Sequence, residues 1–116
     1  MKNLLFACVL LVTAISGCKS VYSTTTIESK KTFVIGDNEH EAFEVTIKNI
    51  SNDVVEIAQK PNDGIVKLLQ SLESKKTAVI KIEKNTALHL ENKSDNKVAV
   101  ALNFKSTSHL SMGYKN

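Results

Sequence analysis

The chain has 116 residues, of which 42% are hydrophobic and 23% charged, and its formal net charge is +3. All 15 basic residues are lysine, so the sequence lacks the arginine fork that recognises phosphates and guanine edges. This composition argues against nucleic-acid binding and is typical of one domain with a working hydrophobic core.

The first 17 residues have the layout of a secretory signal peptide. A basic start at Lys2 is followed by the apolar run LLFACVLLVTAI, twelve residues from Leu4 to Ile15. A helix of that length covers ~18 Å, which is short of the ~30 Å hydrocarbon core of a bilayer. We therefore expect a signal helix rather than a membrane span.

The apolar run ends in Ile15-Ser16-Gly17-Cys18, which resembles the lipobox of bacterial lipoproteins. The resemblance implies cleavage between Gly17 and Cys18 and a diacylglyceryl group on the Cys18 thiol. The newly formed amine is usually acylated in that family, and two or more chains anchor a protein stably. Cys18 is therefore predicted to be a membrane tether.

Two neighbouring features bear on this prediction. Cys8 would leave with the signal peptide, so the mature chain would contain no thiol free to form a disulfide. In well-studied Gram-negative lipoproteins an aspartate after the cysteine favours the inner membrane. Lys19 stands at that position here, which favours the outer membrane.

The sequence divides into three expected regions: a signal peptide at 1–17, a lipidated cysteine with a Ser/Thr-rich tether at 18–26, and a folded domain at 27–116. The end of the tether region, Tyr22 to Ile27, could instead join a sheet as an edge strand.

From Lys31 onward the dominant hydrophobic period is two, as in strands with one buried face. The stretch GIVKLLQ, from Gly64 to Gln70, is left open between a strand and a single helical turn. The alternating runs are Phe43–Ile47, Ala78–Ile82, Leu88–Leu90 and Val98–Phe104, and turn signals lie at Gly36–Asn38, Asn49–Asp53, Pro61–Gly64, Lys84–Asn85 and Asn92–Asn96.

About seven or eight short strands at this spacing predict an all-β fold, a small Ig-like two-sheet β-sandwich. Each sheet then has one apolar face, and packing the two sheets together covers both faces. Val100, in the last alternating run, is expected between the sheets.

Two stretches resemble each other at an offset of 43: IKNISNDVVEIA from Ile47 and LENKSDNKVAVA from Leu90. Each is interpreted as a hairpin made of a strand, a polar turn and a strand. Asn49 and Asn92 occupy matching places in Asn-X-Ser sequons. We interpret the sequons as turn chemistry, because asparagine and serine side chains bond nearby backbone amides.

One acidic segment is a candidate cation site. His40 lies among Asp37, Glu39, Glu41 and Glu44 in GDNEHEAFE. Carboxylates suit calcium and imidazole suits zinc or copper, but the spacing matches no metal-binding loop. We expect a solvated acidic hairpin tip.

His89, His109 and Met112 are the other weak metal candidates. Periplasmic copper carriers use histidine and methionine on small β-sandwiches, and SHLSMGYKN is faintly similar to them. Residues three apart on a strand face opposite ways, however, so His109 and Met112 would not share a ligand set. No metal site is predicted.

No constellation of residues predicts catalysis, since no serine sits in a nucleophile elbow and Cys18 would carry lipid. We therefore expect a non-enzyme without a cofactor. The leading hypothesis is a membrane-anchored cell-envelope interaction or structural module, which meets an envelope protein through an edge strand or loop tips. The alternative is a periplasmic copper- or zinc-binding carrier.

Overall fold

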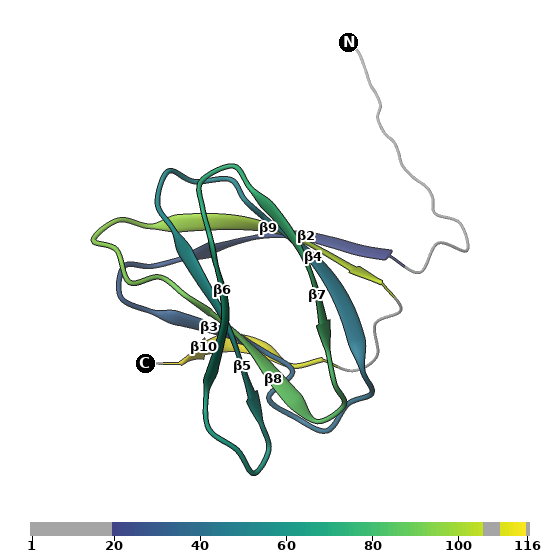
Figure 1. Ribbon diagram of the computed structural model, residues 1–116. Coiled ribbons are helices and arrows are strands. Elements are labelled where there is room, and N and C mark those ends of the chain that lie inside the picture. The colour runs from purple at the N-terminus through teal and green to yellow at the C-terminus, as the bar shows by residue number, and fades with distance from the viewer. Residues whose placement is uncertain (1–19, 106–109, 116) are drawn as a thin grey trace.

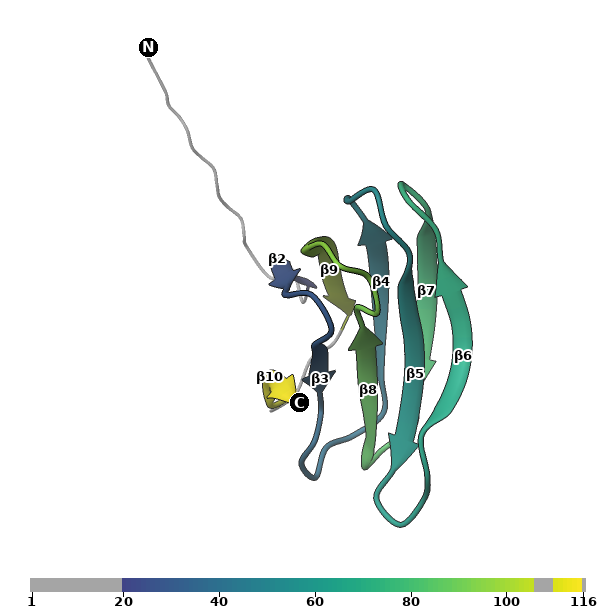
Figure 2. The same cartoon turned by 90° about the vertical axis from the view of Figure 1, so that its left-hand side faces the viewer.

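The computed structural model describes residues 20–105 and 110–115, and in these residues the chain forms strands but no helix. The strands build two antiparallel sheets that pack face to face (Figures 1 and 2). The five-stranded sheet has the order β10 (Met112–Lys115), β3 (Thr32–Ile35), β8 (Thr86–Glu91), β5 (Val55–Pro61), β6 (Lys67–Leu72), and the four-stranded sheet has the order β2 (Ser20–Ile27), β9 (Val98–Lys105), β4 (Phe43–Asn49), β7 (Thr77–Ile82).

The predicted all-β sandwich is confirmed. The described part of the chain forms nine strands, against the seven or eight expected. One of the additional strands is β10, whose four residues, MGYK, show too little alternation to be recognised in the sequence. The expected signal helix lies outside the described residues. Within the described part, no helix is long and apolar enough to cross a bilayer.

The first described strand changes the expected domain boundary. Residues 20–26, assigned to the tether from the sequence, form most of β2 and pair with β9 along the whole strand, from Ser20 opposite Lys105 to Ile27 opposite Val98. Serine and threonine suit this place because an edge strand has one solvated side. Residues 20–26 therefore belong to the sheet, which includes the edge strand Tyr22–Ile27 that had been left open.

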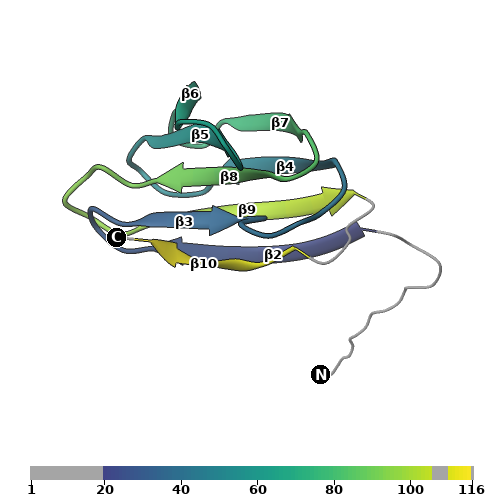
Figure 3. The ribbon, with the colours of Figure 1, turned by 90° about the horizontal axis from the view of Figure 1, so that it is seen from below.

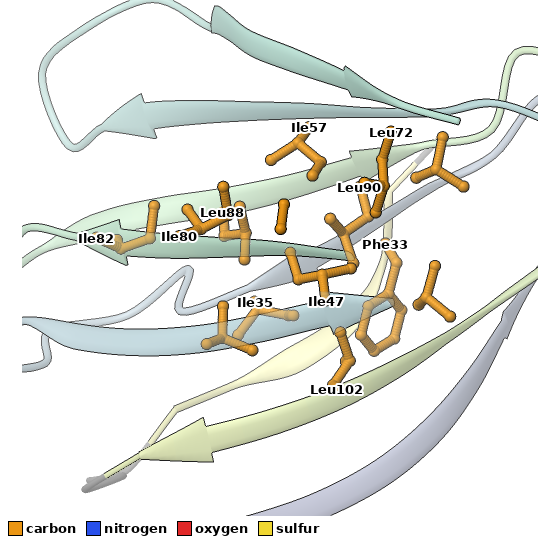
Figure 4. Packing of buried hydrophobic residues seen from close by; sticks show 14 of the residues in the cluster. Phe33, Ile35, Ile47, Ile57, Leu72, Ile80, Ile82, Leu88, Leu90 and Leu102 are labelled. Atoms are coloured by element: carbon orange, nitrogen blue, oxygen red, sulfur yellow. The ribbon is translucent and has the colours of Figure 1, made fainter. Parts of the chain in front are cut away.

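The core lies between the sheets and follows the alternation of the sequence. On β9, Val100, Leu102 and Phe104 are fully buried, whereas Lys105 at the end of the strand is exposed. Figure 4 shows apolar side chains of both sheets meeting in this layer, among them Ile47 of β4 and Leu90 of β8. Burial of this apolar surface is the main favourable contribution to folding.

Two stretches depart from simple alternation. The ambiguous GIVKLLQ segment contains the start of a strand, β6, whose residues 67–71 are exposed on both faces. On β8, by contrast, both faces are buried. The outward-facing His89 lies between Val34 of β3 and Ala58 of β5, so its neighbours in the sheet shield it.

The repeat at offset 43 is part of a larger internal repeat. IESKKTFVI (27–35) and LESKKTAVI (72–80) share seven of nine residues at an offset of 45. The strand pairings repeat with the sequence, because β2, β3, β4 and β5 correspond in order to β6, β7, β8 and β9. Each pairing in the four-stranded sheet then has a counterpart in the five-stranded sheet. The β2–β9 pairing corresponds to β6–β5, the β4–β9 pairing to β8–β5, and the β4–β7 pairing to β8–β3. The two halves are thus related by an approximate twofold axis that exchanges the sheets.

The repeated segments are not the hairpins that were expected. The turn after Asn49 leads from β4 in the four-stranded sheet to β5 in the five-stranded sheet, and the turn after Asn92 leads back from β8 to β9. Both are therefore arches across the sandwich. A hairpin and an arch have the same strand–turn–strand sequence pattern, and only long-range pairing distinguishes them.

Candidate functional site

The predicted lipidation site, Cys18, and the predicted cleavage site between Gly17 and Cys18 lie outside the described residues, and so does His109. What the structure adds is the position of the first strand. Only Lys19 separates Cys18 from Ser20, the first residue of β2. Cys18 thus precedes the first strand by two positions in the sequence.

His40 is a structural residue of the connection between β3 and β4. Its ring is buried, and both ring nitrogens face backbone carbonyls: Nδ1 lies 2.6 Å from Glu41 O and Nε2 lies 2.9 Å from Thr86 O. Its backbone N–H donates to Asn85 Oδ1 at 2.9 Å, and the ring makes an edge contact with Phe43. This histidine joins the β3–β4 connection to the start of β8, and neither nitrogen is free for a metal.

His89 and Met112 are not brought together. His89 lies opposite Val34, and its side chain faces outward from the five-stranded sheet. Met112 lies opposite Ile35, whose side chain is in the core, so Met112 is on the other face of the same sheet. His40 contacts Thr86, three residues along β8 from His89, which is ~10 Å at the rise of a strand.

The acidic segment crosses between the sheets, so it is an arch rather than a hairpin tip. Asp37, Glu39 and Glu41 are exposed. Glu44, on β4, forms an ion pair instead, in which its Oε2 lies 3.4 Å from Lys105 Nζ. Across residues 20–105 and 110–115, no three His, Cys, Asp or Glu side chains gather closely enough to hold a metal ion.

Asn49 and Asn92 have the structural role predicted for them. Asn92 Nδ2 donates to the carbonyls of Ile27, Glu28 and Asn96, and its Oδ1 accepts from the N–H and the hydroxyl of Ser94. Asn49 makes the matching bonds to Asp53 and Leu72 and from Ser51. Both side chains are buried, so these amides close the arches.

Two turns that support the arches were missed in the sequence. In each ESKK segment the third residue, Lys30 or Lys75, has a positive φ, 63° and 66° respectively. The following lysine carbonyl, of Lys31 or Lys76, accepts from the backbone N–H of Asn92 or Asn49 at 2.9 Å. A positive φ is usually signalled by glycine in a sequence, and lysine gives no such signal. The repetition of ESKKT was the available signal.

The most prominent unexplained surface is apolar and lies on one side of the sandwich. Ile65 is 84% exposed, just before β6, and Leu68 on β6 and Val79 on β7 are more than half exposed. β6 and β7 lie side by side at one border of the two sheets, and β2 and β10 form the opposite border (Figures 2 and 3). Exposed apolar side chains on open strand edges are typical of interaction surfaces.

A shallow depression of about 330 Å³ lies near the end of β7. Phe43 and Ile82 contribute apolar surface, and Glu44, Lys81 and Lys105 contribute charged groups. The depression is open and holds no nucleophile with an adjacent base, so its chemistry suits contact with a side chain of a partner.

No protein-family model matches the chain. No curated protein matches it at a significant level either.

Proposed function

We propose that the protein is a lipid-anchored component of the bacterial cell envelope whose β-sandwich acts as an interaction or structural module. The lipobox-like Ile15-Ser16-Gly17-Cys18 supports the anchor, and Lys19 favours the outer membrane. The exposed apolar side chains on β6 and β7 support an interaction role rather than a catalytic one.

The observation that carries this proposal is the short distance between Cys18 and the folded domain. β2 starts at Ser20 and pairs with β9 from its first residue. A diacylated Cys18 would therefore hold the sandwich directly against the bilayer, with little free linker. Such a domain meets partners at the membrane surface, which suits a structural module better than a carrier that must reach across the periplasm.

Membrane fractionation tests the placement. We expect the protein in the outer-membrane fraction of a density gradient, detected with an antibody to the sandwich. The Lys19→Asp variant keeps the anchor and changes only the residue after it, and it is expected to shift toward the inner membrane. If both proteins band with the inner membrane, the outer-membrane placement is contradicted.

Titration with copper or zinc tests the alternative carrier role. The engaged nitrogens of His40, and the placement of His89 and Met112 on opposite faces of a sheet, give no reason to expect tight binding. Stoichiometric submicromolar binding that is lost in His89→Ala would favour the carrier.

A further inference from the structure

The approximate twofold relation between the two halves leaves one strand without a counterpart. The twofold relation makes β3 and β7 equivalent. In the five-stranded sheet, β10 pairs with the outer edge of β3. In the four-stranded sheet, no strand of the described chain pairs with the outer edge of β7. The edge of β7 is therefore the place where a tenth strand would complete the symmetry.

The backbone of β7 is oriented to accept such a strand. Asn49 N–H donates to Lys76 O across the β4–β7 ladder. Bonded and non-bonded pairs alternate along an antiparallel ladder, so the backbone groups of Thr77, Val79 and Lys81 point outward from the sheet. These three residues offer a row of unpaired donors and acceptors along the open edge.

The matching row on β3 is bonded to β10. The residues that correspond to Thr77, Val79 and Lys81 are Thr32, Val34 and Gly36. Gly36 N–H donates to Ser111 O at 2.7 Å, at the start of this pairing. The same backbone geometry is thus already used once in the molecule.

The side chains show the consequence of the missing strand. Val34 and Val79 occupy equivalent positions, and each faces outward from its sheet. Val34, with Gly113 of β10 opposite it, is 5% exposed, whereas Val79 is 58% exposed. Val34 lies between Gly113 of β10 and His89 of β8, whereas Val79 has only Thr46 of β4 beside it, so an added strand would give Val79 its second neighbour.

We propose that β7 is the docking edge for an extended segment of a partner protein, which pairs antiparallel with it as a fifth strand of the four-stranded sheet. This inference rests on the proposed role as an interaction module and names the kind of partner. Its recognition is by strand addition, in which backbone bonds supply affinity and alternate side chains supply specificity.

The pairing of β10 with β3 predicts the sequence that fits. Gly113 opposes Val34, and a Cβ at Gly113 would meet nothing within 4 Å, so the residue opposite Val79 is not restricted to glycine. Tyr114 lies opposite Phe33, makes an edge contact with its ring, and donates its hydroxyl to Thr26 O on β2. Alanine replaces this phenylalanine on β7, at position 78, which leaves more room for an aromatic ring opposite it.

The charge around β7 adds a second requirement. The segment from Lys75 to Lys84 has four lysines and one glutamate. Lys81 is exposed on the outer face beside the open edge. Acidic residues in the partner segment, especially opposite Lys81, would pair with these lysines. The partner chemistry is therefore a short extended segment with an aromatic residue opposite Ala78 and an acidic residue opposite Lys81.

A peptide experiment tests this edge directly. The probe is the acetylated and amidated hexapeptide Leu-Ser-Met-Gly-Tyr-Lys, which copies residues 110–115, added to the ¹⁵N-labelled full chain in detergent micelles. We expect NMR shift changes at Thr77, Val79 and Lys81 that saturate in the millimolar range. The same peptide with Ser111→Glu places a carboxylate opposite Lys81 and is expected to bind several-fold more tightly.

Backbone methylation of the peptide supplies the matched control. A methyl group on the glycine nitrogen removes a donor that faces β7, and binding should be lost. A methyl group on the tyrosine nitrogen lies on the far side of the added strand, and binding should persist.

The proposal is overturned if neither peptide shifts β7, if the shifts fall on β2 or β6 instead, or if both methylated peptides behave alike. A dimeric mass in sedimentation, together with NMR contacts between the β7 strands of two copies, would also overturn it. Any of these results would leave the envelope proposal standing, because lipid labelling and membrane fractionation do not depend on β7.

Discussion

Asn49 and Asn92 are the residues on which the sandwich depends most at the level of single side chains. Each buried amide bonds to a carbonyl of its own arch and to the end of one distant strand, and it fixes a serine of its own turn. The two arches also touch, since Asn96 Nδ2 donates to Asp53 Oδ2 at 3.2 Å. A buried carbonyl that loses its partner costs free energy, so these bonds stabilise the fold mainly by leaving no polar group unsatisfied.

Replacing Asn92 tests this role. Asn92→Ala removes the two N–H donors that serve three buried or half-buried carbonyls, and we expect the free energy of unfolding to fall by about 2–4 kcal/mol. Asn52→Ala, at an exposed position in the equivalent arch, should cost under about 0.5 kcal/mol. Urea denaturation measures both. Equal midpoints would show that the amide network contributes nothing.

Gly36 offers a second test at a single residue. Its φ is +81°, and a Cβ there would lie 2.9 Å from His40 Nε2, so Gly36→Ala brings both backbone strain and a collision. We expect a loss of more than about 1 kcal/mol. Gly113→Ala is the control, because a Cβ at that glycine meets nothing within 4 Å. Thermal unfolding should show a lower Tm for the first variant alone.

The strands show how much of the fold the sequence predicts. Alternation predicted β4, β7 and β9 correctly because each has one face in the core and one face toward solvent. It failed at β6, where residues 67–71 are exposed on both faces and the hydrophobic pattern has no buried face to follow. Whether a turn makes a hairpin or an arch depends on pairing between distant strands, which period-two patterns do not contain.

The site was less predictable than the strands. His40 was considered as a ligand because it stands among acids, but its ring turns inward to Thr86, a residue 46 positions away in the chain. The β7 edge was found only through the larger repeat. The alternation of β7 does not show whether a further strand pairs with its edge, as β10 pairs with β3.

At the scale of the element, the positive φ of Lys75 provides a prediction about the turn before β7. Glycine adopts this conformation without strain, so Lys75→Gly should raise the free energy of unfolding by about 0.5–1 kcal/mol. The neighbouring Lys76→Gly has no such strain to relieve and should lower the free energy of unfolding. Chemical denaturation of the two variants side by side decides it. Destabilisation in both variants would contradict the account of this turn.

The whole molecule is one core shared by two interleaved halves. Because the twofold relation exchanges the sheets, each sheet takes strands from both halves and neither half can bury its apolar faces alone. We therefore expect the described domain to unfold in a single cooperative transition.

A charge placed between the sheets tests this shared core. Val100 is fully buried, so Val100→Asp puts an unpaired carboxylate among apolar side chains. The cost should be several kcal/mol, against a total stability of ~5–15 kcal/mol for a domain. The exposed Lys81→Ala should cost under about 0.5 kcal/mol. If urea melts of the two variants coincide, the assignment of the buried face is contradicted.

The central claim is that this sandwich is held at a membrane by lipid on Cys18. Metabolic labelling with radioactive palmitate in a bacterial host measures it most directly. The natural chain and Cys8→Ser should both incorporate label, because Cys8 lies in the apolar run ahead of the lipobox. Cys18→Ser should incorporate none and should keep its unprocessed length. Undiminished labelling of Cys18→Ser would contradict the account.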